Sequence, residues 1–227
     1  EMTERRVAAT GDNRFVLAWQ RSHQESGEWV DDIYLAVRDD NGEEIRPVSR
    51  FTEDPGWGEG YYGLGLAPLA QNRVLVTYAG DWAGDIYYAI LNSAGNVVFP
   101  VTNLTSDGSS PWDSGADAAQ LSNGDIVIAW PSRDGFFSRV RYAVLGSSYG
   151  LQSGPALLSG SPAVGGDGFP SVAPSGATAV LTWMDMGDSR HLYYALIDGS
   201  GGITTPPMIF WRSELGVFTS DAGYGNT

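Results

Sequence analysis

The sequence has no cysteine, no lysine and only two histidines, His23 and His191, among its 227 residues. Without cysteine the chain cannot form disulfide bridges, cysteine-ligated zinc sites or iron–sulfur clusters, and it carries no thiol nucleophile. The two histidines lack the spacing of a metal-binding pair, and no nucleophile motif lies beside them. We therefore expect surface or hydrogen-bonding roles for both histidines.

Positive charge and long apolar runs are also scarce. The 13 basic residues are all arginine and stand against 27 acidic residues, which gives a net charge of −14. Such a charge repels nucleic acids and anionic membrane surfaces, so we expect no nucleic acid partner. No apolar run approaches the roughly 18 residues of a membrane-spanning helix, so we expect no membrane insertion. The composition favours an extracellular or cell-surface protein whose export signal has been removed.

The sequence does contain a pattern that recurs four times. Each copy has an apolar run closed by an aromatic residue: Trp19, Tyr78, Trp130 and Trp183. A second run follows with alanine in its fourth place: Ala36, Ala89, Ala143 and Ala195. A proline comes 11 or 12 residues later: Pro47, Pro100, Pro155 and Pro206. The closing aromatics lie 59, 52 and 53 residues apart, so the unit is about as long as a propeller blade.

The runs within each copy are typical of short β-strands. They are rich in valine, isoleucine, tyrosine and tryptophan and are bounded by glycine, asparagine, aspartate or proline. A segment of small residues precedes each copy: Val7–Ala9, Leu66–Ala67, Ala118–Ala119 and Val172–Ala173. We therefore expect four antiparallel strands per copy, A to D: the small-residue segment, the run closed by the aromatic, the run with alanine, and the segment after proline. We expect the closing aromatics to lie in the core.

This pattern predicts an all-β fold, a β-propeller of four-stranded antiparallel blades. The chain would form a single domain, residues 1–227, of four repeats of about 53 residues: about 1–60, 61–113, 114–168 and 169–227. Small residues in strand A fit a crowded central axis. A β-sandwich and an open solenoid are the alternatives. We favour four blades that close on themselves, over half of a two-chain ring (a homodimer) or a segment of a longer chain.

The repeat resembles bacterial extracytoplasmic β-propellers related to the sialidase-like repeats, and the resemblance covers essentially the whole chain. Repeats of that type carry an Asp box, Ser-x-Asp-x-Gly-x-x-Trp, between the outer strands. The nearest segment here is Ser132-Arg133-Asp134-Gly135-Phe136, which lacks that spacing and lies between strands B and C. The arginine triad and the Tyr–Glu pair of the sialidases match no positions here, so the resemblance implies the fold and no catalytic residue.

The candidate ligand-binding residues lie in the B–C and D–A loops, which are long and emerge on one face of a propeller. A loop tryptophan either packs onto the blades or presents a flat plate on which a sugar ring can stack, and neighbouring polar side chains can bond to hydroxyl groups. The predicted ligand-binding residues are Trp29, Asp32, Trp57, Trp82, Asp85, Trp112, Asp113 and Arg133.

No cofactor is expected, although calcium binding by the acidic loops is an alternative. Asp31 with Asp32, or Asp81 with Asp85, could supply oxygen ligands. No EF-hand or nonapeptide calcium pattern is present, so solvated surface charge is the alternative interpretation.

These features favour a non-enzymatic extracellular recognition module. Its tryptophan- and aspartate-rich loops would bind a carbohydrate or a protein surface. One alternative is a structural building unit of a surface layer, fibre or adhesin. A glycoside hydrolase or lyase ranks last, because we can assign no acid–base constellation and therefore expect no enzyme.

Overall fold

The computed structural model describes residues 2–25, 27–52, 60–80, 84–106, 112–135, 137–158, 167–185 and 191–211. The regular elements in these ranges are β-strands, and a search of them finds no helix long and apolar enough to cross a membrane. The fold below is therefore built from sheets and turns.

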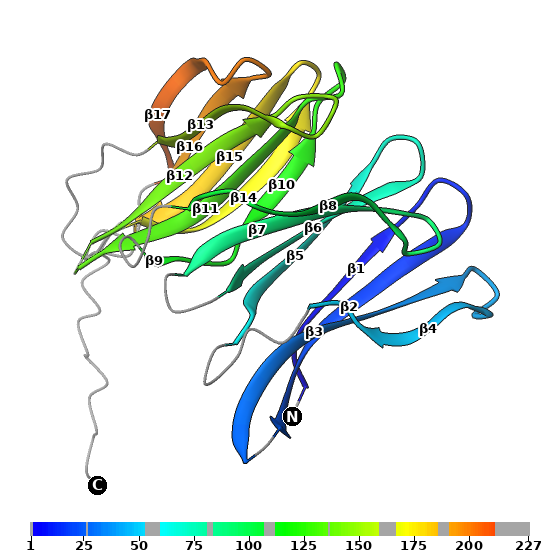
Figure 1. The fold of residues 1–227 in the computed structure, drawn as a ribbon. Coiled ribbons are helices and arrows are strands. Elements are labelled where there is room, and N and C mark those ends of the chain that lie inside the picture. Colours follow the sequence, from blue (N-terminus) through cyan, green and yellow to red (C-terminus); the bar gives the residue numbers. More distant parts are fainter. Residues whose placement is uncertain are drawn as a thin grey trace, which may run out of the picture.

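Seventeen strands form four antiparallel sheets in chain order (Figure 1). The first sheet contains β1 (Met2–Ala9), β2 (Arg14–Glu25), β3 (Glu28–Asp39) and β4 (Glu44–Arg50). The second contains β5 (Tyr62–Leu69), β6 (Arg73–Gly80), β7 (Asp85–Asn92) and β8 (Val97–Asn103). The third contains β9 (Trp112–Asp113), β10 (Asp117–Gln120), β11 (Ile126–Asp134), β12 (Phe137–Leu145) and β13 (Leu151–Leu157). The fourth contains β14 (Asp167–Ser175), β15 (Thr178–Asp185), β16 (Leu192–Asp198) and β17 (Ile203–Trp211).

The predicted fold class is confirmed, because each sheet is a propeller blade with the expected A-to-D strand order. The blades differ in detail from the expected repeat limits. β9 pairs with β11 of the third blade, although it lies before residue 114. The start of β14 likewise lies before residue 169 and pairs with β15 of the fourth blade.

The C–D turns of three blades are built in the same way. An Asp or Asn closes strand C, and its Oδ1 accepts hydrogen bonds from the backbone N–H groups two and four residues later, over 2.8–3.0 Å. These residues are Asp39, Asn92 and Asp198. The glycine three residues further on has φ of 82°, 78° and 86°, respectively, a conformation that glycine adopts without a steric penalty.

The blades follow one another side by side, and the small-residue strands β1, β5, β10 and β14 contact one another in this order (Figure 1). Among the described residues no apolar layer joins the fourth blade to the first, so closure of the four blades on themselves stays a prediction. Side chains of these strands accept hydrogen bonds from the backbone of the neighbouring inner strand. Leu64 N–H donates to Glu4 Oε2 (2.6 Å), Ala70 N–H, just after β5, donates to Gln120 Oε1 (2.6 Å), and Val172 N–H donates to Asp117 Oδ2 (2.8 Å). We call these three contacts the inter-blade hydrogen bonds.

Three apolar layers between successive blades form the core. The middle blades are covered on both faces, so that β6 and the first half of β11 are buried almost throughout. The end blades bury one face each, and β15 alternates between buried and partly exposed residues. The closing aromatics Tyr78, Trp130 and Trp183 are buried, as predicted. Trp19 is half-buried because it lies on the outer face of the first blade.

Candidate functional site

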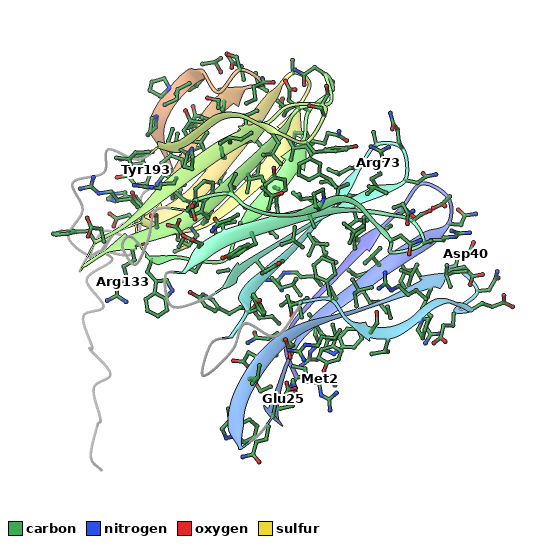
Figure 2. The ribbon with its side chains drawn as sticks, in the orientation of Figure 1. Met2, Glu25, Asp40, Arg73, Arg133 and Tyr193 are labelled. Atoms are coloured by element: carbon green, nitrogen blue, oxygen red, sulfur yellow. The ribbon has the colours of Figure 1, made fainter. Side chains whose placement is uncertain are left out.

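The predicted loop face is the end of the blades at which strands B end and strands C and A begin, and we call this end the mouth. Figure 2 shows Met2, Glu25 and Arg133 at this end, and Asp40 and Arg73 at the opposite end of the sheets. The two ends are therefore well separated, as the topology requires.

All four inner strands are irregular at the mouth. Register shifts lie between Thr3 and Arg5 in β1, Tyr62 and Gly65 in β5, and Gly168 and Ser171 in β14. In the third blade, residues 114–116 separate β9 from β10. Bulges of this kind bend a strand and re-aim side chains, and they often lie beside active sites. The four blades thus depart from regular pairing at the same level.

A cavity of about 530 Å³ lies at this level. Its walls come from all four blades, mostly from the inner strands and the segment before β10: Glu4 and Arg6, residues 62–66, residues 114–117 with Pro131, and Pro170. We call it the central cavity. Because every blade contributes to it, it lies at the centre of the fold, where propeller loops converge.

Two carboxylates and one guanidinium group line the central cavity. Glu4 lies on the β1 bulge with φ of 34°, which is uncommon for a residue other than glycine. Asp117 is fixed more firmly, because its carboxylate accepts hydrogen bonds from Val172 N–H (2.8 Å), Ser171 Oγ (3.1 Å) and the N–H of Ala118 (2.9 Å). Arg6 is exposed on the same strand as Glu4. The cavity can therefore present acid–base groups and a positive charge to one ligand.

Two glycines let the second and third blades approach closely beside the cavity. Gly63 has φ of 63°, and a Cβ atom there would lie 2.9 Å from Gly115 Cα. A Cβ on Gly65 would meet the carbonyl oxygen of Ala116 and the hydroxyl of Thr77. These contacts leave no space for a side chain, so the Gly-x-Gly segment is needed for the shape of the mouth.

Glu4, Arg6 and Asp117 are not among the residues predicted from the sequence. They lie in the small-residue strands, for which we expected axial packing, whereas we expected the ligand-binding residues in the loops. The signal that could have drawn attention to this level is the glycine and proline content at or just before the start of three of the four inner strands: Gly63, Gly65, Gly115, Gly168 and Pro170. Such residues inside a strand often mark bulges.

Three of the predicted residues come together at the mouth. Trp112 pairs with Arg133 across β9 and β11, and Asp113 pairs with Ser132. Asp113 is fully buried, and its N–H donates to Gly84 O over 3.0 Å. The Trp112 side chain is 51% exposed, and its ring centroid lies 6.3 Å from that of Tyr62.

Two more predicted residues, Asp32 and Asp85, lie inside the blades. Thr52 Oγ1 donates to Asp32 over 3.0 Å, and Thr105 Oγ1 donates to Asp85 over 3.1 Å. The same hydroxyls accept hydrogen bonds from the next backbone N–H of strand C, that of residues 33 and 86. We call this arrangement the Asp–Thr clamp. Arg50 also contacts Asp32, with Nε 3.0 Å from Oδ1.

The remaining predicted residues are not part of these groups. Trp29 is 65% exposed on the first B–C hairpin. Trp57, Trp82 and the possible calcium ligand Asp81 lie outside the described residues. Among the residues that the structure describes, no group of three or more His, Asp or Glu side chains is arranged to hold a metal ion.

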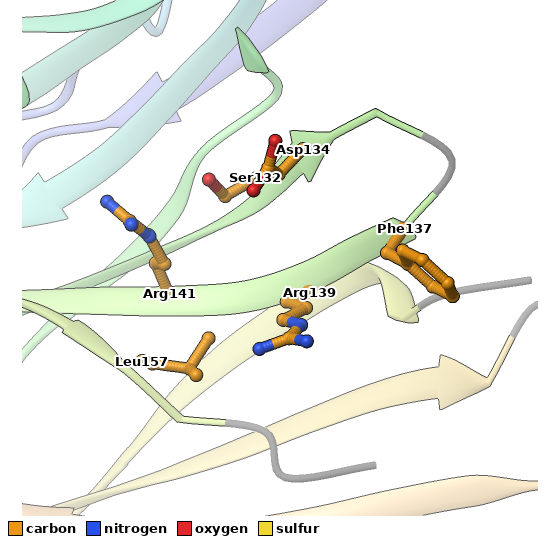
Figure 3. A pocket seen from close by; sticks show the side chains of 6 residues that line it. All are labelled: Ser132, Asp134, Phe137, Arg139, Arg141 and Leu157. Carbon is orange, nitrogen blue, oxygen red and sulfur yellow. The ribbon is translucent and has the colours of Figure 1, made fainter. Parts of the chain in front are cut away.

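A second, smaller hollow of about 180 Å³ lies on the third blade (Figure 3). Its lining comes from the hairpin β11–β12 and the end of β13: Ser132, Asp134, Phe137, Arg139, Arg141 and Leu157. We call it the arginine cleft. Pro131 lines the central cavity and the next residue, Ser132, lines the cleft, so both hollows reach the same stretch of β11. The side chains of consecutive strand residues point to opposite faces of the sheet.

Comparison with known proteins identifies the fold. No model of a protein family and no curated sequence matches the chain. Among solved structures, an ulvan lyase of polysaccharide lyase family PL25 superposes with a TM-score of 0.69 and 11% identity, over 93% of this chain and 56% of the lyase. A thermostable family-43 glycoside hydrolase superposes with a TM-score of 0.52 and 14% identity, over 90% of this chain and 75% of the hydrolase. The sialidase of Trypanosoma rangeli superposes with a TM-score of 0.59 and 8% identity, over 91% of this chain and 38% of the sialidase.

These similarities confirm a sialidase-like β-propeller fold. The chain spans about half the length of the ulvan lyase, 56%, and so corresponds to only part of that enzyme. The similarities also contradict our expectation of a non-enzymatic recognition module. Neighbours of this fold include polysaccharide lyases and glycoside hydrolases, which contradicts the expectation that the chain is not an enzyme. The error arose because the charged residues that line the central cavity lie in two separate repeats, the first and the third, and form no local motif.

Proposed function

We propose that this propeller belongs to an extracellular enzyme that cleaves glycosidic bonds in a polysaccharide. The observation that carries the proposal is the central cavity, in which Glu4 of the first blade and Asp117 of the third line one space. The activities of the lyases and hydrolases with the same fold support it. The acidic, cysteine-free composition agrees with an extracellular location.

Cleavage of a glycosidic bond needs a group that protonates the leaving oxygen and a second group that acts as base or nucleophile. In hydrolysis both groups are carboxylates, held about 5–10 Å apart. In elimination a base removes a proton next to the carboxyl group of a sugar acid, and a cation stabilises the negative charge that develops. The cavity offers Glu4, Asp117 and Arg6 for these tasks.

The hydrogen bonds distinguish the two carboxylates. Asp117 accepts three hydrogen bonds and is thereby held in one orientation, which suits a group that positions substrate or stabilises charge. Glu4 accepts one bond, from Leu64 N–H, and lies on a bulge. We therefore assign to Glu4 the proton transfer and to Asp117 the supporting role.

The test is activity on a panel of neutral, uronate-containing and sulfated polysaccharides, measured as release of reducing ends. Elimination also creates a carbon–carbon double bond that absorbs ultraviolet light, so the same samples separate lyase from hydrolase. We expect Glu4→Gln to lower the rate by about 100-fold or more, since the amide cannot transfer a proton. Asp117→Asn should also lower the rate.

The control is Glu43→Gln, the same change at an exposed residue of the first C–D turn, at the opposite end of the blade. It should leave the rate unchanged. Circular dichroism of each variant checks the fold. The proposal is wrong if the native protein cleaves no polysaccharide of the panel, or if Glu4→Gln and Asp117→Asn both retain full activity.

A further inference from the structure

The four blades provide an internal comparison for every position of the repeat, because the pairing of strands B and C aligns them residue by residue. The residue opposite the closing aromatic is Tyr34, Tyr87 and Tyr193 in the first, second and fourth blades. In these blades the two rings stack, with centroids 6.2, 5.6 and 5.8 Å apart. In the third blade the residue opposite Trp130 is Arg141. The third blade thus has a charged group in place of a stacked ring.

A second position differs in the same blade. Two residues before the tyrosine, the first and second blades have the buried aspartate of the Asp–Thr clamp, Asp32 and Asp85. The fourth blade has His191 at this position. The third blade has Arg139 at this position, opposite Ser132, and its side chain is exposed. A position that supports the first and second blades is therefore occupied in the third by a cation that faces solvent.

Arg141 takes the place of a stacked ring found in the three other blades, and Arg139 takes the place of an aspartate that stabilises two of them. Both arginines line the arginine cleft (Figure 3). Positions at which a sequence departs from a locally consistent pattern are often functional. The cleft holds two guanidinium groups and one carboxylate, Asp134, so its lining is positive on balance in a protein of net charge −14. Arginine can bind a carboxylate or a sulfate through two parallel hydrogen bonds.

We infer that the arginine cleft binds an anionic group of a glycan, a carboxylate or a sulfate ester, and that the substrate is an acidic polysaccharide. That the bound polysaccharide is a substrate rests on the proposed function, whereas the binding of the anionic group does not require cleavage. The exposed ring of Phe137 gives the cleft an apolar plate for the sugar that bears the anion. A volume of about 180 Å³ suits one sugar unit of a polymer and not a whole ligand.

The test uses variants that give the third blade the residue types of the other blades. Arg141→Tyr restores a ring opposite Trp130, and Arg139→Asp introduces the residue of the first two blades. Arg139→Gln serves if Arg139→Asp does not fold. The control is Arg38→Asp, which makes the same charge change at the turn end of β3, where Arg38 pairs with Glu44.

Calorimetry in a Glu4→Gln background, in which no cleavage is expected, gives dissociation constants for polygalacturonate, a sulfated galactan and neutral arabinan. We expect at least one acidic polymer to bind about tenfold more tightly than arabinan, and each cleft variant to reduce that binding about tenfold. Arabinan binding and the Arg38→Asp variant should show no change. Preference for polygalacturonate identifies a carboxylate, and preference for the sulfated galactan identifies a sulfate ester.

The inference is overturned if arabinan binds as tightly as both acidic polymers, or if both cleft variants keep the preference for an acidic polymer. The two proposals fail in different ways. Arginine-dependent binding of an acidic polymer by a native protein that cleaves nothing supports the cleft and contradicts the enzyme. Cleavage of neutral and acidic polymers alike, unaffected by either variant, supports the enzyme and contradicts the cleft.

Discussion

At the scale of single residues, the Asp–Thr clamp explains why charged groups lie inside two of the blades. Asp85 is buried and accepts hydrogen bonds from Asn103 Nδ2 (2.6 Å) and Thr105 Oγ1 (3.1 Å), and the threonine hydroxyl accepts from Ile86 N–H. A buried carboxylate is stable only when such donors satisfy it. The clamp therefore joins the start of strand C to the segment that follows strand D.

We predict that Asp85→Ala lowers the free energy of unfolding by about 2–3 kcal/mol, because it leaves the Asn103 and Thr105 donors without their acceptor. Urea denaturation, followed by tryptophan fluorescence, measures the change. Asp40→Ala, at an exposed residue, should change stability by no more than about 0.5 kcal/mol. Equal effects of the two substitutions would contradict a structural role for Asp85.

At the scale of elements, the C–D turns show that one geometry accepts either an acid or an amide. Asn92 makes with an amide oxygen the bonds that Asp39 and Asp198 make with a carboxylate. At Asp198 the carboxylate makes the stability of the turn depend on pH. The hydroxyl of Ser200, followed by the N–H of Gly202, lowers the pKa of Asp198 below its ordinary value.

A lowered pKa means that Asp198 contributes stability above the pKa of the unfolded chain, about 4, and that this contribution is lost as pH falls through the lower pKa of the folded protein. We predict that Asp198→Asn is destabilising near neutral pH, by less than about 1 kcal/mol because the turn is open to solvent. The difference from the native protein should shrink towards pH 2. Thermal unfolding at several pH values measures it, and a difference that grows on acidification would have the wrong sign.

At the scale of the whole molecule, burial is uneven along the row of blades. The middle blades lie between two apolar layers, whereas the first and fourth blades each have one face outside the three core layers. Phe15, Leu17 and Trp19 lie partly exposed on the outer face of the first blade. In stacked repeats stability comes largely from the contacts between neighbours, so the end blades should be the less stable ones.

We predict that amide hydrogen exchange is slowest in β6 and β11 and faster in β15 and β2, although all four are the B strands of their blades. The reason is that opening of an end blade breaks one apolar layer, while opening of a middle blade breaks two. Mass spectrometry of peptides from each strand measures the rates. Equal protection of all four strands would show that the blades unfold as one unit.

The fold could be predicted from the sequence because every blade repeats the same apolar and turn residues, and repetition makes a weak strand signal clear. The site could not. Glu4 and Asp117 are far apart in the chain and line one cavity only when the blades pack side by side, so no local pattern marks them. The Asp–Thr clamp did have a signal, since Asp and Thr are 20 residues apart in both blades, but we assigned the aspartates to ligand binding.

The inter-blade hydrogen bonds have a consequence for attempts to redesign this protein. Glu4 and Asp117 line the cavity and also hold the backbone of a neighbouring blade, so a library that randomises them would damage the architecture together with the chemistry. Positions 139 and 141 are better starting points for directed evolution. Sibling repeats already tolerate aspartate and tyrosine there, so specificity can be altered without disturbing the framework.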